Sequence, residues 1–272
     1  MSTKPTTPVT PVAASTGAVI DAAAVPGTAV VSWKDKMAAI TAQAVQSEAP
    51  KGGYLSFKGG NISFNDDLIP GNKLNVIVLD FLLENYHFAE AYSGGSAIPV
   101  CFAFGREESE LAPHKDAEDP QSDECGTSGE EGCCPLNEWG SASNGGRGKG
   151  CANSRRVAVI AADCIPKGLD AIKKASVLML KVPVTSVYLF SKFVNQTAQA
   201  LETPPFGVIV ELSTKPDKKN LFSVNWKVIG QTTDQEVLEA LYNKRMSIQD
   251  KLFAPYVKIE PEAEKSTRSG KF

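Results

Sequence analysis

The chain has 272 residues, of which 42% are hydrophobic and 22% charged, and its formal net charge is −3. This composition supplies enough apolar side chains for a core, and its slightly acidic balance excludes a uniformly basic nucleic-acid-binding chain. No apolar run reaches the roughly 18 residues that a membrane-spanning helix needs, so we expect no membrane partner.

The first 28 residues are rich in Thr, Pro, Val and Ala and show little periodicity. We interpret residues 1–28 as a flexible leader. They lack the order of a signal peptide, in which basic residues precede an apolar run, so we expect a protein of the reducing cytoplasm. Trp33, Met37 and Ile40 follow at helical spacing and predict a short amphipathic helix that ends before Pro50.

A series of β-strands is predicted next. Residues 54–57 and 61–64 alternate around Gly59-Gly60, which indicates a hairpin. Apolar runs rich in β-branched residues predict further strands at residues 74–83, 98–104, 157–160 and 177–182.

The last third of the chain predicts two helices that flank two strands. Pro183 and Thr185 begin a helix that ends before Pro204. Thr233 and Glu236 form a capping box that opens a final amphipathic helix, which reaches about residue 252. The two strands between the helices are predicted at residues 206–212 and 221–228.

This order of elements predicts a mainly β fold with flanking helices (α+β). An OB-type Greek-key barrel fits it, and so would another α+β barrel. The domain would span residues 29–259, with a loop insertion at about 105–153 and a loose C-terminal tail at 260–272. A loop as long as this insertion requires a cross-link within a compact domain.

The insertion carries ligands that suit a structural zinc ion. One imidazole and three thiolates would close a tetrahedral coordination sphere and leave no open position for catalysis. Cys133 competes with Cys134, which we favour because Pro135 stiffens the chain there. Unlinked surface thiols and a disulfide are the alternatives. The predicted ligands are His114, Cys125, Cys134 and Cys151, separated by ten, eight and sixteen residues.

Three other candidate ligands are given structural roles. Cys101 and Cys164 lie in apparent strands, and we interpret both as buried thiols. His87 lies between Tyr86 and Phe88 and is interpreted as a half-buried histidine with satisfied hydrogen bonds rather than a ligand.

Charges are distributed unevenly along the insertion. Residues 106–131 hold ten acidic and two basic side chains, whereas residues 144–156 hold four cations and no acid. Such a basic strip can contact phosphates in a mildly acidic protein, because distant charges are screened. A solvated loop whose cations pair with the acidic run is the alternative. The four cations are Arg147, Lys149, Arg155 and Arg156.

Single-stranded nucleic acid is held by cations together with aromatic faces for base stacking. Trp139, in the insertion, is the strongest stacking candidate, and Tyr54 and Phe102 are further ones. Phe57 and Phe64 are assigned to the core by their alternation. The sequence carries neither a Walker loop nor a dinucleotide-binding fingerprint, and its two histidines leave little for nucleophilic catalysis, so we expect no enzyme.

Several short motifs between residues 99 and 160 resemble those of bacteriophage single-stranded DNA-binding proteins with an OB fold. They are Pro99-Val100-Cys101, Pro120-Gln121-Ser122, Cys134-Pro135-x-Asn137-x-Trp139-Gly140-Ser141, Gly148-Lys149-x-Cys151 and Ser154-Arg155-Arg156. The resemblance implies a protein that coats single-stranded DNA in phage replication or recombination, in the cytoplasm of the bacterial host. It also implies a zinc loop with one His and three Cys, phage replication proteins as partners, and a homo-oligomer on DNA.

The chain departs from that family in two places. The usual close Cys-x-x-Cys pair is stretched between Cys125 and Cys134, which leaves the second ligand open. The end of the chain, residues 265–272, is basic where many such proteins have an acidic tail. The alternative function is a non-catalytic zinc-loop module that docks a basic protein through its acidic insertion.

Overall fold

The computed structural model describes residues 53–89, 98–126, 134–143 and 145–256, together with Trp33 and Met37. The chain divides into two compact units, Met1–Ala49 and Pro50–Phe272. Trp33 and Met37 are helical, as their spacing predicts. The predicted leader and C-terminal tail lie outside the described residues.

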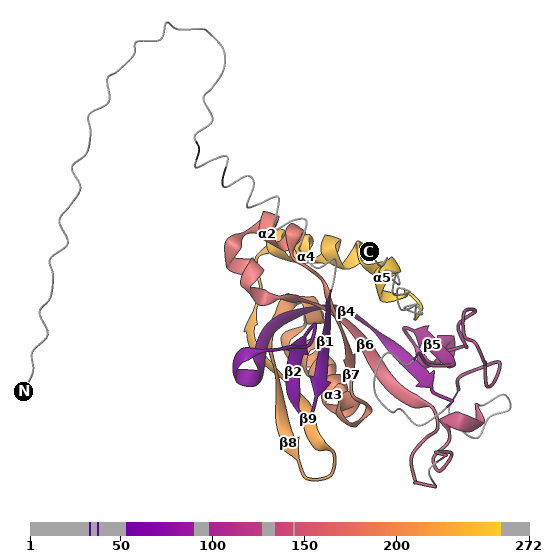
Figure 1. Cartoon of the computed structure of the whole chain (residues 1–272). Coiled ribbons are helices and arrows are strands. Elements are labelled where there is room, and N and C mark those ends of the chain that lie inside the picture. Colours follow the sequence, from indigo (N-terminus) through magenta and orange to yellow (C-terminus); the bar gives the residue numbers. More distant parts are fainter. Residues whose placement is uncertain are drawn as a thin grey trace, which may run out of the picture. The chain divides into compact units, whose positions relative to one another are not determined.

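The described residues of the second unit form one mixed sheet of nine strands (Figure 1). Its order is β3-β2-β1-β7-β6-β4-β8-β9, and β5 pairs with β4 off this path. Among the described strand pairs, β1 and β7 alone run parallel. The strands are β1 (Gly53–Lys58), β2 (Asn61–Phe64), β3 (Asp67–Leu68), β4 (Lys73–His87), β5 (Cys101–Gly105), β6 (Ala152–Ala161), β7 (Leu178–Val182), β8 (Val208–Asp217) and β9 (Leu221–Gln231).

The sheet curls along one long strand, β4, which pairs with three neighbours. The first residues of β4 pair with β8, and the rest pair with β6. The register with β6 shifts between Val78 and Asp80, and such a bulge bends the strand and increases its twist. The result is a half-barrel, which confirms the prediction of a mainly β fold with flanking helices. The predicted hairpin is also confirmed, with both Gly59 and Gly60 at positive φ in its turn.

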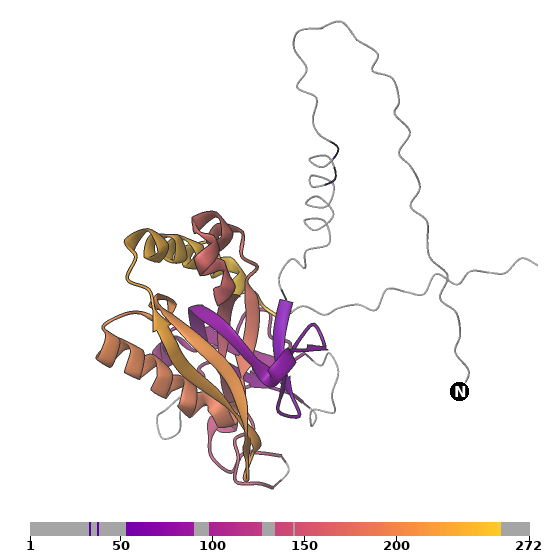
Figure 2. The same cartoon turned by 90° about the vertical axis from the view of Figure 1, so that its left-hand side faces the viewer.

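Helices cover two sides of the curled sheet. Figures 1 and 2 show α2 (Leu169–Lys174), α4 (Gln235–Met246) and α5 (Gln249–Leu252) together at one end, and α3 (Val187–Leu201) apart from them. The N-cap of α4 is Asp234, whose carboxylate accepts from the backbone N–H groups of Glu236 and Val237. The predicted capping box therefore lies one residue too early. None of the described helices is long and apolar enough to cross a bilayer.

Alternate residues of the central strands face two separate cores. Val157 and Val159 point into the half-barrel, where Phe190 of α3 packs edge-on against Trp226 at 4.9 Å between ring centroids. Ala158 and Ile160 point to the opposite side, toward the three clustered helices. Full burial of a side chain such as Phe190 stabilises the fold by about 2–3 kcal/mol. Since both faces of β6 are buried here, its sequence is a continuous apolar run.

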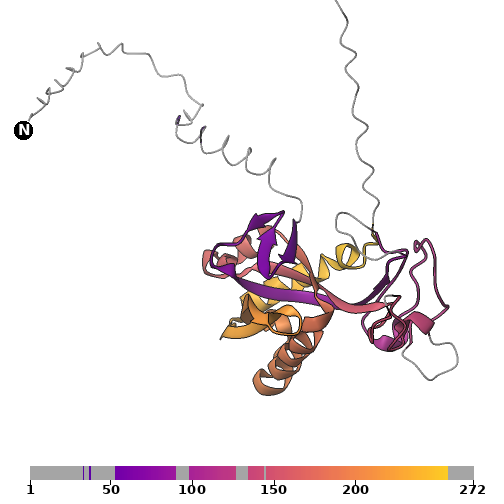
Figure 3. The same cartoon turned by 60° about the horizontal axis from the view of Figure 1, so that its bottom comes forward.

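Beyond these cores, β4 and β6 extend to carry β5 and the predicted insertion (Figure 3). The insertion follows Gly105, the last residue of β5, and ends at Ala152, the first residue of β6. Its described residues contain two short 3₁₀ turns, Glu108–Glu110 and Pro135–Asn137, and neither a strand nor an α-helix. We call residues 106–151 the arm.

Candidate functional site

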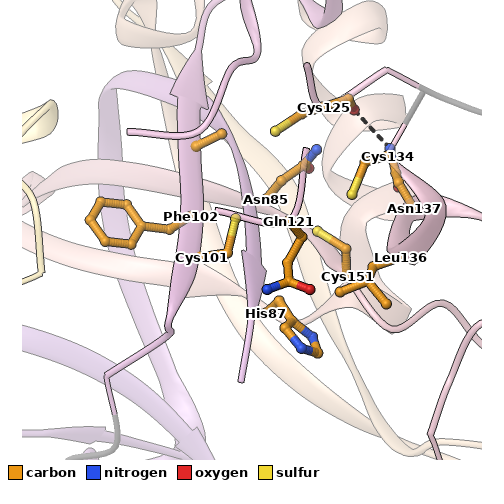
Figure 4. A pocket seen from close by; sticks show the side chains of 11 residues that line it. Asn85, His87, Cys101, Phe102, Gln121, Cys125, Cys134, Leu136, Asn137 and Cys151 are labelled. Atoms are coloured by element: carbon orange, nitrogen blue, oxygen red, sulfur yellow. Dashed lines mark hydrogen bonds between the residues drawn. The ribbon is translucent and has the colours of Figure 1, made fainter. Parts of the chain in front are cut away.

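Four cysteines from separate parts of the chain line one small cavity at the base of the arm. Figure 4 shows the thiols of Cys101, Cys125, Cys134 and Cys151 directed toward one another. All four side chains are buried and are free thiols. The cavity has a volume of about 10 Å³, which is room for roughly one water-sized particle.

The buried amide of Asn137 holds the cysteine-bearing loops together. Its Nδ2 donates to the carbonyl of Cys125 at 2.9 Å, and its backbone N–H donates to the carbonyl of Cys134 at 2.9 Å (Figure 4). The backbone N–H of Cys151 donates to the carbonyl of Leu136 at 2.7 Å. Three of the four thiols are therefore positioned by hydrogen bonds that meet within one turn.

The thiols are also electrostatically coupled. Burial raises the pKa of Cys125 to about 12, and repulsion from the thiolate forms of Cys151, Cys101 and Cys134 adds to this. Burial likewise raises the pKa of Cys151 to about 12, with repulsion from Cys134 and Cys101. Four thiolates in one dry cavity are costly without a cation, and a divalent ion is the usual means of relieving that cost.

The donor set therefore suits a soft or borderline metal such as zinc, which prefers thiolates in its structural sites. In the part of the chain that the structure describes, no group of three or more His, Cys, Asp or Glu side chains has the geometry of a metal site. The fit rests on the identity, burial and common direction of the donors, which would have to draw inward around an ion.

The structure places His114 away from this cavity. Its ring stacks on Phe102 with centroids 5.2 Å apart, and its Nδ1 accepts from the backbone N–H of Asp116 at 3.1 Å. Three of the predicted ligands are thus brought together, and Cys101, which we assigned to the core, takes the fourth place. Cys133, the alternative to Cys134, lies outside the described residues.

The predicted burial of His87 and Cys164 agrees with the structure, although Cys164 lies in the 3₁₀ turn Ala162–Lys167 and not in a strand. His87 is half-buried, and its Nδ1 forms a 2.8 Å hydrogen bond with the carbonyl of Gly150. It also borders the cavity. Cys164 is buried in the core beneath the clustered helices.

The predicted basic strip is divided between two faces of the sheet. Arg155 and Arg156 are neighbours in β6, so their side chains point in opposite directions. Arg156 lies on a largely covered face of the sheet where aromatic rings and cations alternate, which we call the cation–aromatic face. Its members are Tyr86, Phe102, Phe104, Arg156, Lys181 and Tyr256, arranged around Glu84.

Cations cover the rings of this face at close range. The Arg156 guanidinium lies 3.8 Å from the centroid of the Phe104 ring and 5.1 Å from that of Tyr256. The Lys181 ammonium lies 3.9 Å from the centroid of the Tyr86 ring. Such contacts each contribute about 0.5–2 kcal/mol, depending on solvent exposure.

Glu84 lies fully buried beneath these cations. Its Oε1 accepts from Arg156 Nε at 3.1 Å and from the Tyr256 hydroxyl at 2.7 Å, and Lys181 Nζ lies 3.7 Å from its Oε2. Burial lowers the pKa of Lys181, and the Glu84 carboxylate opposes that shift. Burial and the same carboxylate raise the pKa of Tyr256, so its hydroxyl remains a donor. One carboxylate therefore fixes both cations.

The face extends onto the hairpin at the start of the sheet. Tyr54 of β1 is paired with Met179 of β7, two residues before Lys181, so Tyr54 and Lys181 share one side. The Tyr54 side chain is 73% exposed. At the other end, Arg156 Nη1 donates to the carbonyls of Leu252 and Ala254, which holds the segment 253–256 over the face.

Lys149 and Arg155 line a groove on the opposite side of the sheet, with a volume of about 830 Å³. Lys149 Nζ donates to Oδ1 of Asn137 and of Asn153 at 3.0 and 3.1 Å. Burial lowers the pKa of Arg155. Among the described residues, no ion pair joins the groove's two cations to its acidic wall. That wall consists of Glu108, Glu110, Asp123 and Glu124.

The remaining predicted residues lie on the arm. Trp139 is 79% exposed, and Lys149 Nζ lies 5.6 Å from the centroid of its ring. Arg147, two residues before Lys149 in the sequence, is also exposed. Sequence reasoning did not identify Glu84, Lys181 or Tyr256, because their meeting depends on strand pairing and on the path of the chain after α5.

The chain matches no protein-family model, no curated protein and no solved structure at a significant level. The geometry of these sites therefore carries the functional argument.

Proposed function

We propose that this protein binds single-stranded DNA without catalysis, across the cation–aromatic face. One observation carries the proposal: aromatic rings and cations alternate on a single face that crosses five strands, β1, β7, β6, β4 and β5. Cations for phosphates beside rings for bases are what binding of single strands requires.

The connections of the strands support an OB-type barrel as the finer description of the fold. β4, β6, β7, β8 and β9 would be its five strands, and α3 would be the helix between the third and the fourth. The pairs β4–β6, β6–β7, β4–β8 and β8–β9 are present as that fold requires, while the hairpin β1–β2 occupies the edge of β7. Barrels of this type bind oligonucleotides across their second and third strands, which here carry Arg156 and Lys181.

In this proposal each group has a separate role. Arg156 and Lys181 neutralise phosphates, and Tyr54, Tyr86 and Phe104 stack on bases. The side chain of Phe102 is only 2% exposed, so a base reaches it only after the segment 253–256 moves. Glu84 holds both cations beside the rings.

A structural zinc ion in the thiol cavity would fix the arm against β5. Zinc supplies cross-linking here rather than chemistry, since four protein ligands close its coordination sphere. The motif resemblance extends the proposal to a role in phage DNA replication or recombination in the host cytoplasm. Phage replication proteins as partners and a homo-oligomer on DNA belong to the same extension.

The experiment compares two exposed tyrosines. Tyr54 lies on the face and Tyr188 lies on α3, with exposed fractions of 73% and 76%. We expect Tyr54→Ala to weaken binding to a labelled oligo-dT about tenfold, because one stacked base is worth about 1–3 kcal/mol. Tyr188→Ala should leave the affinity unchanged. The wild type should also lose affinity linearly in log salt, by about 0.7 per phosphate contact. Equal affinities in both variants, or no binding at low salt, would overturn the proposal.

A protein-docking module is the second candidate, and the acidic wall of the groove favours it. Four carboxylates beside an open groove suit a basic peptide better than a phosphate chain. The fluorescence of the exposed Trp139 distinguishes the two candidates at low cost. Trp139 lies beside Lys149 of the groove, so a basic peptide bound there should quench its fluorescence, whereas oligo-dT bound across the cation–aromatic face should leave it unchanged.

A further inference from the structure

We infer that Cys101 completes a four-thiolate zinc site with Cys125, Cys134 and Cys151, in place of His114. This inference deepens the structural zinc of the proposed function, and its test does not depend on DNA binding. It rests on three observations: the position of Cys101 in β5, the lining of the cavity, and the environment of His114.

Cys101 points to the cavity because of its place in the strand. It is the first residue of β5 and pairs with His87 of β4. Side chains alternate along a strand, so Cys101 and Ala103 point to one side while Phe102 and Phe104 point to the other. The first pair borders the thiol cavity or its walls, and the second pair belongs to the cation–aromatic face. One ligand is therefore held by a paired strand.

The other three thiols lie outside strands. Cys125 follows the acidic stretch of the arm, Cys134 precedes a 3₁₀ turn, and Cys151 precedes β6. Loops can draw inward more readily than a strand, and zinc requires each sulfur at about 2.3 Å. A fixed strand ligand with three loop ligands thus allows the site to close around an ion in the small cavity.

Hydrogen-bond donors of the kind that surround thiolate ligands are already present. The amide side chains of Asn85 and Gln121 line the cavity beside the thiols. The ammonium of Lys149 donates to Asn137, which also lines the cavity. These groups offset part of the double negative charge that zinc with four thiolates carries.

His114 is separated from the cavity by β5 itself. Its ring lies on the side of Phe102, and its backbone N–H donates to the carbonyl of Phe102 at 2.7 Å. To bind the same ion it would have to leave this stack and cross the strand. On binding, four S–H bonds break, four Zn–S bonds form, and four protons pass to the solvent.

X-ray absorption of the full-length zinc-loaded wild type tests the site without any substitution. We expect four sulfur neighbours at about 2.3 Å and no nitrogen neighbour at about 2.0 Å. Three sulfurs with one nitrogen would overturn the role of Cys101 while leaving a structural zinc. A wild type that binds neither Zn²⁺ nor Co²⁺ stoichiometrically would overturn the site altogether, whatever its affinity for DNA.

Variants provide the second arm of the test. We expect one zinc per chain in the wild type, in His114→Gln and in Cys164→Ser, which is a matched control for a buried thiol elsewhere. Cys101→Ser should weaken zinc binding at least a hundredfold in a competition with a chelator. Retention of wild-type affinity in Cys101→Ser, or loss of zinc in His114→Gln, would contradict the inference.

Discussion

The guanidinium of Arg156 lies over the ring of Phe104, with its central carbon 3.8 Å from the ring centroid. Phe104 lies in β5 and Arg156 lies in β6. These two strands do not pair with each other, and each of them pairs with β4. Arg156 also bonds the buried Glu84 and two backbone carbonyls. A guanidinium carries several hydrogen-bond donors on one planar group, which explains why this position holds an arginine.

Arg156→Lys is the first prediction. The substitution keeps the charge and removes both the ring stacking and the multiple donors, so oligo-dT affinity should fall about tenfold. Arg155→Lys is the matched control, since its side chain points into the opposite groove, and it should change affinity less than twofold. Fluorescence anisotropy at one fixed salt concentration measures both. An equal loss in the two variants would place DNA elsewhere.

The division of Arg155 and Arg156 could not be anticipated, because both lay between the insertion, predicted to end at about residue 153, and the strand predicted to begin at residue 157. β6 begins at Ala152, three residues before Arg155, so strand alternation separates the two side chains. The same alternation puts Phe102 and Phe104 on one face. Local sequence patterns thus predicted the secondary-structure elements. The exact strand boundaries decided to which side of the sheet each side chain points.

The metal ligands show a different limit. Three of the four proposed ligands follow from the spacing of cysteines within one loop. Cys101 lies in an apolar strand, where a thiol is ordinarily a core residue, and only the pairing of β5 with β4 brings it to the cavity. Long-range convergence of this kind leaves no local signal in the sequence.

Glu84→Gln is the second prediction, and it should change protein stability and DNA affinity in opposite directions. Removing one charge of a buried cluster leaves Arg156 and Lys181 without compensation, so the free energy of unfolding should fall by roughly 3 kcal/mol. Loss of the same negative charge should raise oligo-dT affinity several-fold at low salt. Urea unfolding and anisotropy measure the two effects. Glu211→Gln, which breaks an exposed pair with Lys73, is the control and should change neither.

Tyr256→Ala is the third prediction. The Tyr256 ring lies 5.1 Å from Phe102 between centroids, and its hydroxyl bonds both Glu84 and Lys181. If the segment 253–256 must leave before DNA reaches Phe102, loosening it should raise affinity several-fold. Phe253→Ala alters the same segment at a ring that contacts Arg106 and should leave affinity unchanged. Weaker binding by Tyr256→Ala would show instead that its ring belongs to the interface.

The fourth prediction concerns Asp80, which links the start of the arm to the clustered helices. Its carboxylate accepts from Arg106 at 2.9 and 3.1 Å and from Gln249 at 2.9 Å, and lies 3.2 Å from Nε of Arg245. Burial alone would raise the pKa of Asp80, but the hydrogen bonds from Arg106 and Gln249 and the charge of Arg245 hold it below its ordinary value. Asp80→Asn should therefore reduce the free energy of unfolding at pH 7 by about 2 kcal/mol, a figure that allows for the partial exposure of Arg106.

The pH dependence of this difference has a definite sign. A carboxyl group with a lowered pKa in the folded state stabilises the fold fully above its unfolded pKa, near 4, and loses that contribution as the pH falls through the folded value. The gap between wild type and Asp80→Asn in urea unfolding should thus stay constant from pH 7 to pH 5 and shrink below pH 4. Asp66→Asn, at an exposed pair with Lys58, is the control and should show no gap at any pH. A gap that widens in acid would mean that Asp80 is held by packing rather than by its charge.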